Sequence, residues 1–125
     1  MVPIQSLRLS EKAKKQLATL KRNTGIRNRN VLCRWAFCIS VAEPTTPVAT
    51  RIPTEGGIDM AWNTFGGTEH EVYGAALKAR CKQDGLPVDR ETLNDQFRLH
   101  VHRGLGYLLG SSDLRGIVNL MKKVV

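Results

Sequence analysis

The hydrophobic repeat changes from a spacing of two residues to a helical spacing within residues 1–43, and this order restricts the possible folds. Ser6–Leu9 alternates polar and apolar residues, which is typical of a short strand with one buried face. Ser10 then has the position and chemistry of a helix N-cap, with Glu11 in the first turn. After it, apolar residues recur at helical spacing, namely Ala13, Leu17 and Leu20.

A glycine turn separates this helix from a second one. Asn23–Gly25 predicts the end of the first helix, with Gly25 in the left-handed conformation that glycine adopts readily. Asn28 or its neighbour is the expected cap of the second helix, which Pro44 ends because proline cannot continue the hydrogen-bond ladder. The predicted buried stripe of this helix is Leu32, Trp35, Ala36 and Ile39.

The strand-to-helix junction Ser6–Glu11 resembles that of the ribbon-helix-helix family, which includes the Arc and MetJ repressors. The resemblance implies that strands from two chains pair and that the ribbon enters the DNA major groove. It also implies that Leu7 and Leu9 lie in a dimer core. Ile4 and Gln5 reverse the polar and apolar order of that family, which favours backbone binding over base reading.

Positive charge is concentrated in the same segment. The chain has 19 Lys and Arg residues against 11 Asp and Glu residues, a net charge of +8, and residues 1–43 alone carry +7. Such a local excess attracts polyanions, nucleic acid first and an acidic membrane surface second. We therefore expect double-stranded DNA to be bound by Ser6, Arg8, Lys12, Lys14, Lys15, Lys21, Arg22, Arg27, Asn28 and Arg29.

Residues 44–125 are expected to form a helical half for oligomerisation and partners within a single domain that spans residues 1–125. Val48–Pro53 is expected to be extended, and Ile58–Trp62 to be a strand. A capping box of Thr68 and Glu71 predicts a helix that runs to about Lys82. The predicted buried side of that helix is Val72, Ala76 and Ala79.

Two more helices complete the expected fold. Asp89 caps a long helix, in which Gly104 and Gly106 favour close approach of another backbone, such as a helix of another subunit. Its apolar face is Leu93, Phe97, Val101 and Leu108. The last predicted helix runs from Asp113 to about Val124. The expected class is therefore mainly α: a ribbon-helix-helix-like module of one short strand and two helices, an extended or hairpin segment, and three further helices.

Two motifs in this half resemble the DndE family of the bacterial DNA phosphorothioation system. They are Thr64–Lys78 (TFGGTEHEVYGAALK) and His100–Leu108 (HVHRGLGYL). In that system a sulfur atom replaces a non-bridging phosphate oxygen of DNA. The resemblance implies a small, mainly helical homotetramer that binds duplex DNA, with a preference for nicked duplex. It also implies a cysteine desulfurase, an ATP-using sulfur-transfer enzyme and an ATPase as partners.

Residues that could carry catalysis or hold a metal are sparse. Cys33 and Cys38 lie about 140° apart on one helix and are expected to be buried structural thiols. Cys81 has basic neighbours, which favour a lower thiol pKa. His100 and His102 diverge on a helix, and the sequence has no phosphate-binding Walker loop. We expect no catalytic residue, cofactor or metal, and a cytoplasmic protein that is not an enzyme.

Two functions remain open at this stage. The first is a non-catalytic DNA-binding subunit of the phosphorothioation machinery, acting beside its other subunits as a homo-oligomer, a dimer or a tetramer, with the tetramer favoured by the resemblance. The second is a sequence-specific ribbon-helix-helix transcriptional repressor. The long C-terminal half and the reversed order of Ile4 and Gln5 favour the first.

Overall fold

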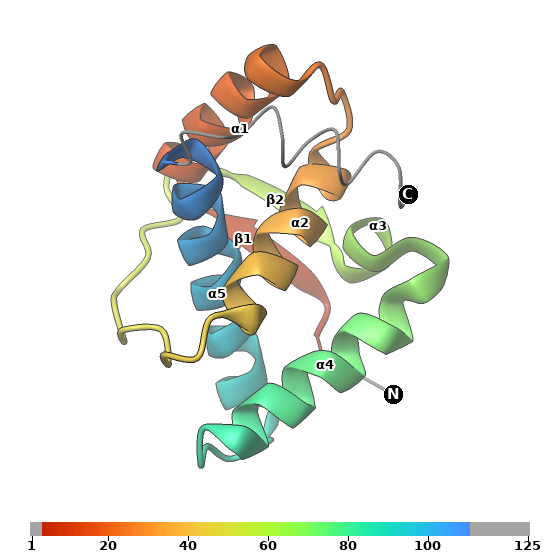
Figure 1. The fold of residues 1–125 in the computed structure, drawn as a ribbon, viewed down its shortest axis with the longest axis vertical. Coiled ribbons are helices and arrows are strands. Elements are labelled where there is room, and N and C mark those ends of the chain that lie inside the picture. Colours follow the sequence, from red (N-terminus) through yellow and green to blue (C-terminus); the bar gives the residue numbers. More distant parts are fainter. Residues whose placement is uncertain (1–3, 111–125) are drawn as a thin grey trace.

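Helices surround a two-stranded ribbon in the computed structural model, which describes residues 4–110 (Figure 1). In chain order the elements are β1 (Ser6–Leu9), α1 (Glu11–Thr24), α2 (Arg29–Ala42), β2 (Ile58–Ala61), α3 (Trp62–Gly66), the 3-10 turn η1 (Gly67–Glu69), α4 (His70–Gln83) and α5 (Arg90–Gly110). The mainly helical class is therefore confirmed. The helix predicted from Asp113 to about Val124 lies outside the described residues.

The ribbon forms within one chain. β1 pairs antiparallel with β2, and the opposing residues include Ser6 with Ala61 and Arg8 with Asp59. Leu7 and Leu9 are fully buried in the core of this chain, so their expected place in a dimer core is corrected. β1 therefore does not require a second chain to find a pairing partner. The predicted second strand ends one residue early, because Trp62 begins α3.

The predicted caps of α1 are confirmed. The Ser10 Oγ accepts a hydrogen bond from the Ala13 N–H at 3.0 Å, and Gly25 has a φ of 75° at the other end. The Ser10 N–H donates to His102 Nε2 at 3.2 Å, while His102 Nδ1–H donates to the Arg98 carbonyl at 2.7 Å. The side chain of His102 thus joins the β1–α1 junction to α5. The buried stripe of α1 contains the predicted residues Ala13, Leu17 and Leu20.

α2 and α5 cross in direct contact in front of the ribbon in Figure 1. Gly104 makes this crossing possible, since a Cβ at this position would stand 1.8 Å from the Ala36 carbonyl oxygen. The close backbone approach that the glycine predicted therefore exists, but its partner is α2 of the same chain and not a helix of another subunit. The predicted α5 cap is confirmed as well, because the Thr92 N–H donates to Asp89 Oδ1 at 2.8 Å.

An aromatic cluster fills the space where α2, α3 and α5 meet. The rings of Phe65 and Phe97 lie 4.7 Å apart, and Phe37 contacts both rings at 5.8 Å, all in edge-to-face geometry. Trp62 stacks on Phe65 at 5.5 Å. Edge-to-face pairs stabilise such clusters beyond the effect of area burial. The short helix α3 therefore fixes the end of β2 to the main helix crossing.

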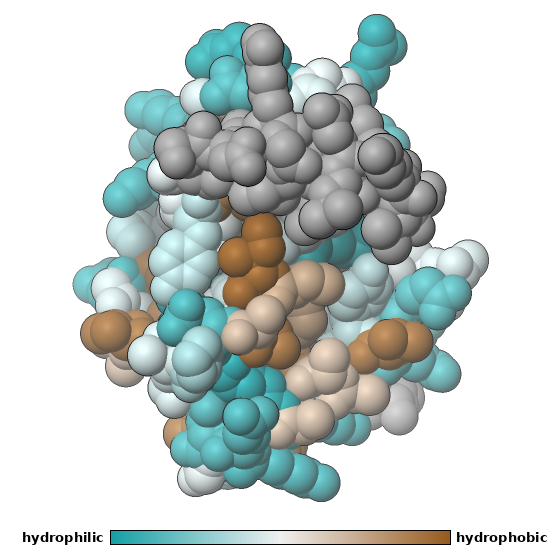
Figure 2. All heavy atoms as spheres, viewed as in Figure 1, coloured by the Kyte–Doolittle hydropathy of each residue, from teal (hydrophilic) through white to brown (hydrophobic). Residues whose placement is uncertain are grey.

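α4 differs from its prediction at its start and on its buried face. The helix begins at His70, and Thr68 lies in the preceding 3-10 turn, so the predicted capping box is wrong. The predicted face is wrong at Val72, which is 60% exposed, and at Ala79, which is exposed, whereas Ala76 is partly buried against the core. The buried residues are Gly74, Leu77, Arg80 and Cys81. Apolar side chains are accordingly visible on the outer surface over α4 and α2 (Figure 2).

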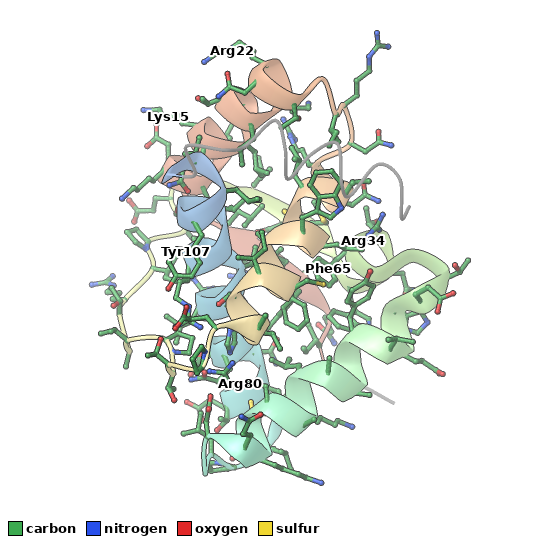
Figure 3. The ribbon with its side chains drawn as sticks, in the orientation of Figure 1. Lys15, Arg22, Arg34, Phe65, Arg80 and Tyr107 are labelled. Carbon is green, nitrogen blue, oxygen red and sulfur yellow. The ribbon has the colours of Figure 1, made fainter. Side chains whose placement is uncertain are left out.

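Two arginines hold the irregular segment that follows α2, and Figure 3 shows one of them, Arg80, turned towards it. Arg80 is 3% exposed, donates from Nε to both Asp84 oxygens at 3.0 Å, and donates from Nη2 to the Thr45 carbonyl at 2.7 Å. Arg103 also binds the Thr45 carbonyl, from Nη1 at 2.8 Å. Buried charges of this kind need partners, and here they have them. The expected extended stretch Val48–Pro53 contains no strand.

Candidate nucleic-acid interface

Four of the ten expected DNA-binding residues gather where α1 turns into α2. Lys21, Arg27, Asn28 and Arg29, which we call the basic turn, line a hollow of about 410 Å³ whose other wall is β2. Lys21 is half-buried, and the other three are exposed. Within residues 4–110, the three cationic side chains of the basic turn make no ion pair. Their charge is therefore available to an anion in solution.

The N-terminus of α2 adds backbone donors to the basic turn. Asn28 is the N-cap, as expected, but its side chain makes no capping hydrogen bond. The first turn of α2 contains no acidic residue that would neutralise the positive end of the helix dipole. Without a side-chain cap, the first N–H groups of α2 remain for outside acceptors, apart from that of Val31, which donates to the Asn28 carbonyl at 3.2 Å. Free N–H groups at a helix N-terminus bind phosphate oxygens. Arg27 and Arg29 are the neighbours of Asn28 in the sequence, are exposed, and line the same hollow.

Ser6 and Arg8 lie on the outward side of the ribbon. They line a second hollow of about 230 Å³ together with Arg90 and Arg98 of α5. Arg8 stands opposite Asp59 in the strand register, and Asp59 also lines the hollow of the basic turn. The outward face of the ribbon therefore connects the two hollows. The sequence pattern does not mark Arg90 and Arg98 as candidate binding residues, because each is an isolated arginine that only the fold brings beside Arg8.

The remaining expected residues are spread around α1. Lys14 is seven residues before Lys21 and so shares its flank of the helix. Lys12 and Lys15 lie on another side, around a shallow hollow that Leu109 of α5 also lines. Lys15 is 78% exposed and 3.6 Å from Glu11, a pairing that contributes little in water. Figure 3 shows Lys15 and Arg22 on the outer side of α1. The ten residues therefore form more than one group.

Comparison with known proteins identifies the family. The sequence profile described as DNA sulphur modification protein DndE matches residues 6–116 of the 125. The chain belongs to the DndE family. Both DndE-like motifs contribute to the core, since Phe65 and Leu77 of the first and Gly104 of the second are buried. These motifs therefore maintain the DndE fold, whereas the basic turn lies outside them.

Solved DndE structures support this assignment. The crystal structure of DndE from Escherichia coli B7A, involved in DNA phosphorothioation modification, is 26% identical, with a TM-score of 0.70 over 86% of this chain and 98% of that chain. A second crystal structure, of a DndE glycine-to-lysine mutant involved in DNA phosphorothioation, is 23% identical, with a TM-score of 0.66 over 86% of this chain and 99% of that chain. This second likeness shows the fold alone. No curated protein has a matching sequence.

The thiols of this DndE family member are not poised for nucleophilic chemistry. Burial raises the pKa of Cys33 to about 12. Cys38 is exposed, which corrects the expectation that it is buried, yet desolvation still raises its pKa. The pKa of Cys81 is raised rather than lowered, first by burial and then by the Asp84 carboxylate. All three thiols are therefore mainly protonated at neutral pH.

In the part of the chain that the structure describes, no three His, Cys, Asp or Glu side chains converge as a metal site would require. The same residues, 4–110, contain no helix with both the length and the apolar character that a membrane crossing demands.

A buried histidine gives the fold a specific pH dependence. Arg103 Nε–H donates to the Ser40 Oγ at 2.8 Å, and His100 Nδ1 shares a hydrogen bond of 2.8 Å with the same hydroxyl group, so only the ring nitrogen Nε2 remains for another contact. That Nε2 is buried without a partner among the described residues. Burial, followed by the charges of Arg103 and Arg80, lowers the pKa of His100 to about 4. The pKa of His102 is also lowered, mainly by burial.

Lowering the pH from 6.5 to about 4 should destabilise the protein. In this window the unfolded chain binds a proton at His100 and the folded chain does not, so the free energy of unfolding falls by up to about 3 kcal/mol. Urea unfolding at several pH values measures the change. In His100→Asn the free energy of unfolding should fall less over the same pH window, because only the contribution of His102 remains. A variant that keeps the full fall would show that His100 is not its source.

Proposed function

We propose that this DndE family member is a non-catalytic DNA-binding subunit of the phosphorothioation machinery, which holds duplex DNA by its phosphates. The observation that carries the proposal is the basic turn. Lys21, Arg27 and Arg29 are cationic and make no ion pair among the described residues, and they line one hollow at the N-terminus of α2, which has no side-chain cap. Backbone N–H groups and guanidinium groups at one place are the donors that phosphate contacts use.

Phosphate binding is favoured over reading of base edges. The outward side chains of the ribbon are Ser6 and Arg8 on β1, with Asp59 and Ala61 opposite them on β2. The positive charge of Arg8 and the negative charge of Asp59 cancel, so this surface of the ribbon has no net charge. The alternative, a sequence-specific repressor, needs a ribbon built from two chains, whereas β1 here pairs with β2 of its own chain. Arg8 serves on this account as a phosphate contact at the edge of the surface.

Oligomerisation is part of the proposal. A homo-oligomer, with a tetramer favoured over a dimer, repeats the basic turn and multiplies the charge of +8 that each chain carries. Duplex DNA and the other subunits of the sulfur-modification complex are the proposed partners. Sedimentation equilibrium of the full chain tests the assembly, since a protein that remains a monomer at micromolar concentration contradicts this part of the proposal.

Fluorescence anisotropy with labelled duplexes tests DNA binding. Two unrelated random sequences should each be prepared as an intact and as a nicked duplex. Their affinities should be measured at two salt concentrations. We expect affinities for the two sequences to agree within a few-fold and to fall strongly with added salt. Salt-independent affinity would contradict phosphate binding. One of the two sequences bound far more tightly than the other would instead support the repressor.

Removing the carboxylate in the basic-turn hollow should strengthen DNA binding. Asp59 lines that hollow and repels a phosphate bound there. Asp59→Asn should lower the Kd for duplex DNA by about two- to fivefold at 0.1 M salt, as expected for an exposed like charge within one Debye length. Glu71→Gln on α4 is the matched control, with the same charge change outside the hollow. Equal effects of the two variants would assign the gain to net charge alone.

A further inference from the structure

A larger cavity lies beyond Arg8, between residues 49–55 and α5. It has a volume of about 820 Å³, and arginines from three separate parts of the chain line it, namely Arg8, Arg51 and Arg98. This volume falls in the range of pockets that bind small ligands. The cavity meets the hollow that Ser6 and Arg90 line, since both include Arg8 and Arg98.

Arg98 is held in place at the wall of this cavity. Its Nη2 donates to the Ile52 carbonyl at 3.0 Å, which fixes the guanidinium group between α5 and the irregular segment. The Nε of Arg98 and the Oε1 of Gln96 are buried without hydrogen-bond partners in the described chain. Buried polar atoms normally have partners, and those that lack them often mark sites with a role beyond folding.

The charges of the lining select the kind of anion. Asp95 and Glu55 also line the cavity, and neither forms an ion pair with an arginine in residues 4–110. Three arginines stand against these two carboxylates in the lining, so the net charge of the cavity is positive and favours a small anion. Apolar walls from Ile52, Pro53 and Leu99 suit an uncharged organic group attached to that anion.

We propose that this cavity binds a phosphate monoester, such as a nucleoside monophosphate, with its phosphate on Arg51 and Arg98 and its organic part against the apolar wall. Guanidinium groups bind phosphate oxygens through paired, charge-assisted hydrogen bonds. The site is separate from the basic turn, and binding of a free monoester there does not depend on the proposed DNA contacts.

Calorimetric titration with inorganic phosphate and with deoxyadenosine monophosphate tests the site. We expect saturable binding of one ligand per chain, with a Kd in the millimolar range or below. Arg51→Gln and Arg98→Lys should each weaken it about tenfold, the loss expected for one charge-assisted contact. Arg51 is exposed, so its variant tests the site even if Arg98→Lys disturbs the fold. Absence of saturable binding, or a monoester affinity in both variants equal to that of the original protein, overturns the proposal.

Duplex DNA binding by the same proteins separates this site from the basic turn. Arg29→Gln, the matched control, should keep monoester affinity within about twofold while it weakens duplex binding by roughly fivefold, about 1 kcal/mol by the conversion used for binding constants. Arg51→Gln should show the opposite pattern. If Arg51→Gln weakens duplex binding as much as Arg29→Gln and leaves monoester binding unchanged, the cavity holds a backbone phosphate and the proposal is overturned.

Discussion

Replacing Gly104 with alanine should lower the free energy of unfolding by at least about 3 kcal/mol and the melting temperature by about 10–20 °C. The added Cβ would stand 1.8 Å from the Ala36 carbonyl oxygen and 2.3 Å from the carbonyl carbon. Both backbones belong to packed helices, so relief of the clash requires α2 and α5 to separate. Thermal and urea unfolding followed by circular dichroism measure the loss.

Gly106→Ala is the matched control on the same helix. Among the described residues, no atom outside the neighbouring turns of α5 lies within 4 Å of a Cβ built at Gly106, and alanine is favoured over glycine in a helix by about 1 kcal/mol. This variant should therefore be as stable as the original protein or more stable. Equal melting temperatures for the two alanine variants would contradict the close crossing of α2 and α5 at Gly104.

Local signals in the sequence predicted helix ends where one side chain decides the geometry. Ser10 and Asp89 cap helices as predicted, because the capping hydrogen bond joins residues three apart in sequence. The capping box at Thr68 failed although its residues fit the pattern. Gly67 has a φ of 60° and places Thr68 inside a 3-10 turn, so that α4 begins at His70.

The buried face of α4 could not be predicted from its pattern. The stripe of Val72, Ala76 and Ala79 has helical spacing, but so does that of Leu77 and Arg80 with Gly74. Alanine gives little preference for either face, and a charged residue normally indicates the solvent side. Arg80 reverses this rule, since Asp84 and backbone carbonyls compensate for its burial. Those carbonyls come from the end of α2 and the segment after it, which a local pattern does not include.

The candidate interface was predictable only where it is continuous in sequence. Lys21 at the end of α1 and Arg27–Arg29 at the start of α2 flank one short connection, so their closeness in sequence already brings their charges together. Arg51, Arg90 and Arg98 reach Arg8 through the pairing of β1 with β2 and the packing of α5. No periodicity links these positions. Their assembly is a property of tertiary structure, as is the contact of Gly104 with α2.

Replacing Lys21, Arg27 and Arg29 together with glutamine should raise the Kd for duplex DNA by about 100-fold at 0.1 M salt. Each phosphate contact contributes on the order of 1 kcal/mol under these conditions, and the three side chains surround one hollow. Fluorescence anisotropy with a random duplex measures the loss. All three residues lie at the surface or near it, and circular dichroism should show an unchanged fold.

A second triple variant removes the same number of positive charges from a different part of the surface. Lys12, Lys15 and Lys82 are exposed and lie outside the hollow of the basic turn. Their replacement with glutamine should raise the Kd by about tenfold or less, through the loss of long-range attraction. Equal losses in the two triple variants would show that net charge, rather than the basic turn, determines DNA affinity.

The salt dependence of duplex binding tests the phosphate contacts of the basic turn most directly. The Kd of the original protein and of the Lys21, Arg27 and Arg29 variant should be measured with one random duplex from about 50 to 300 mM salt. Each phosphate contact adds about 0.9 to the slope of log affinity against log salt. We predict that the variant loses between two and three units of slope. Identical slopes for the two proteins would contradict DNA binding through the basic turn.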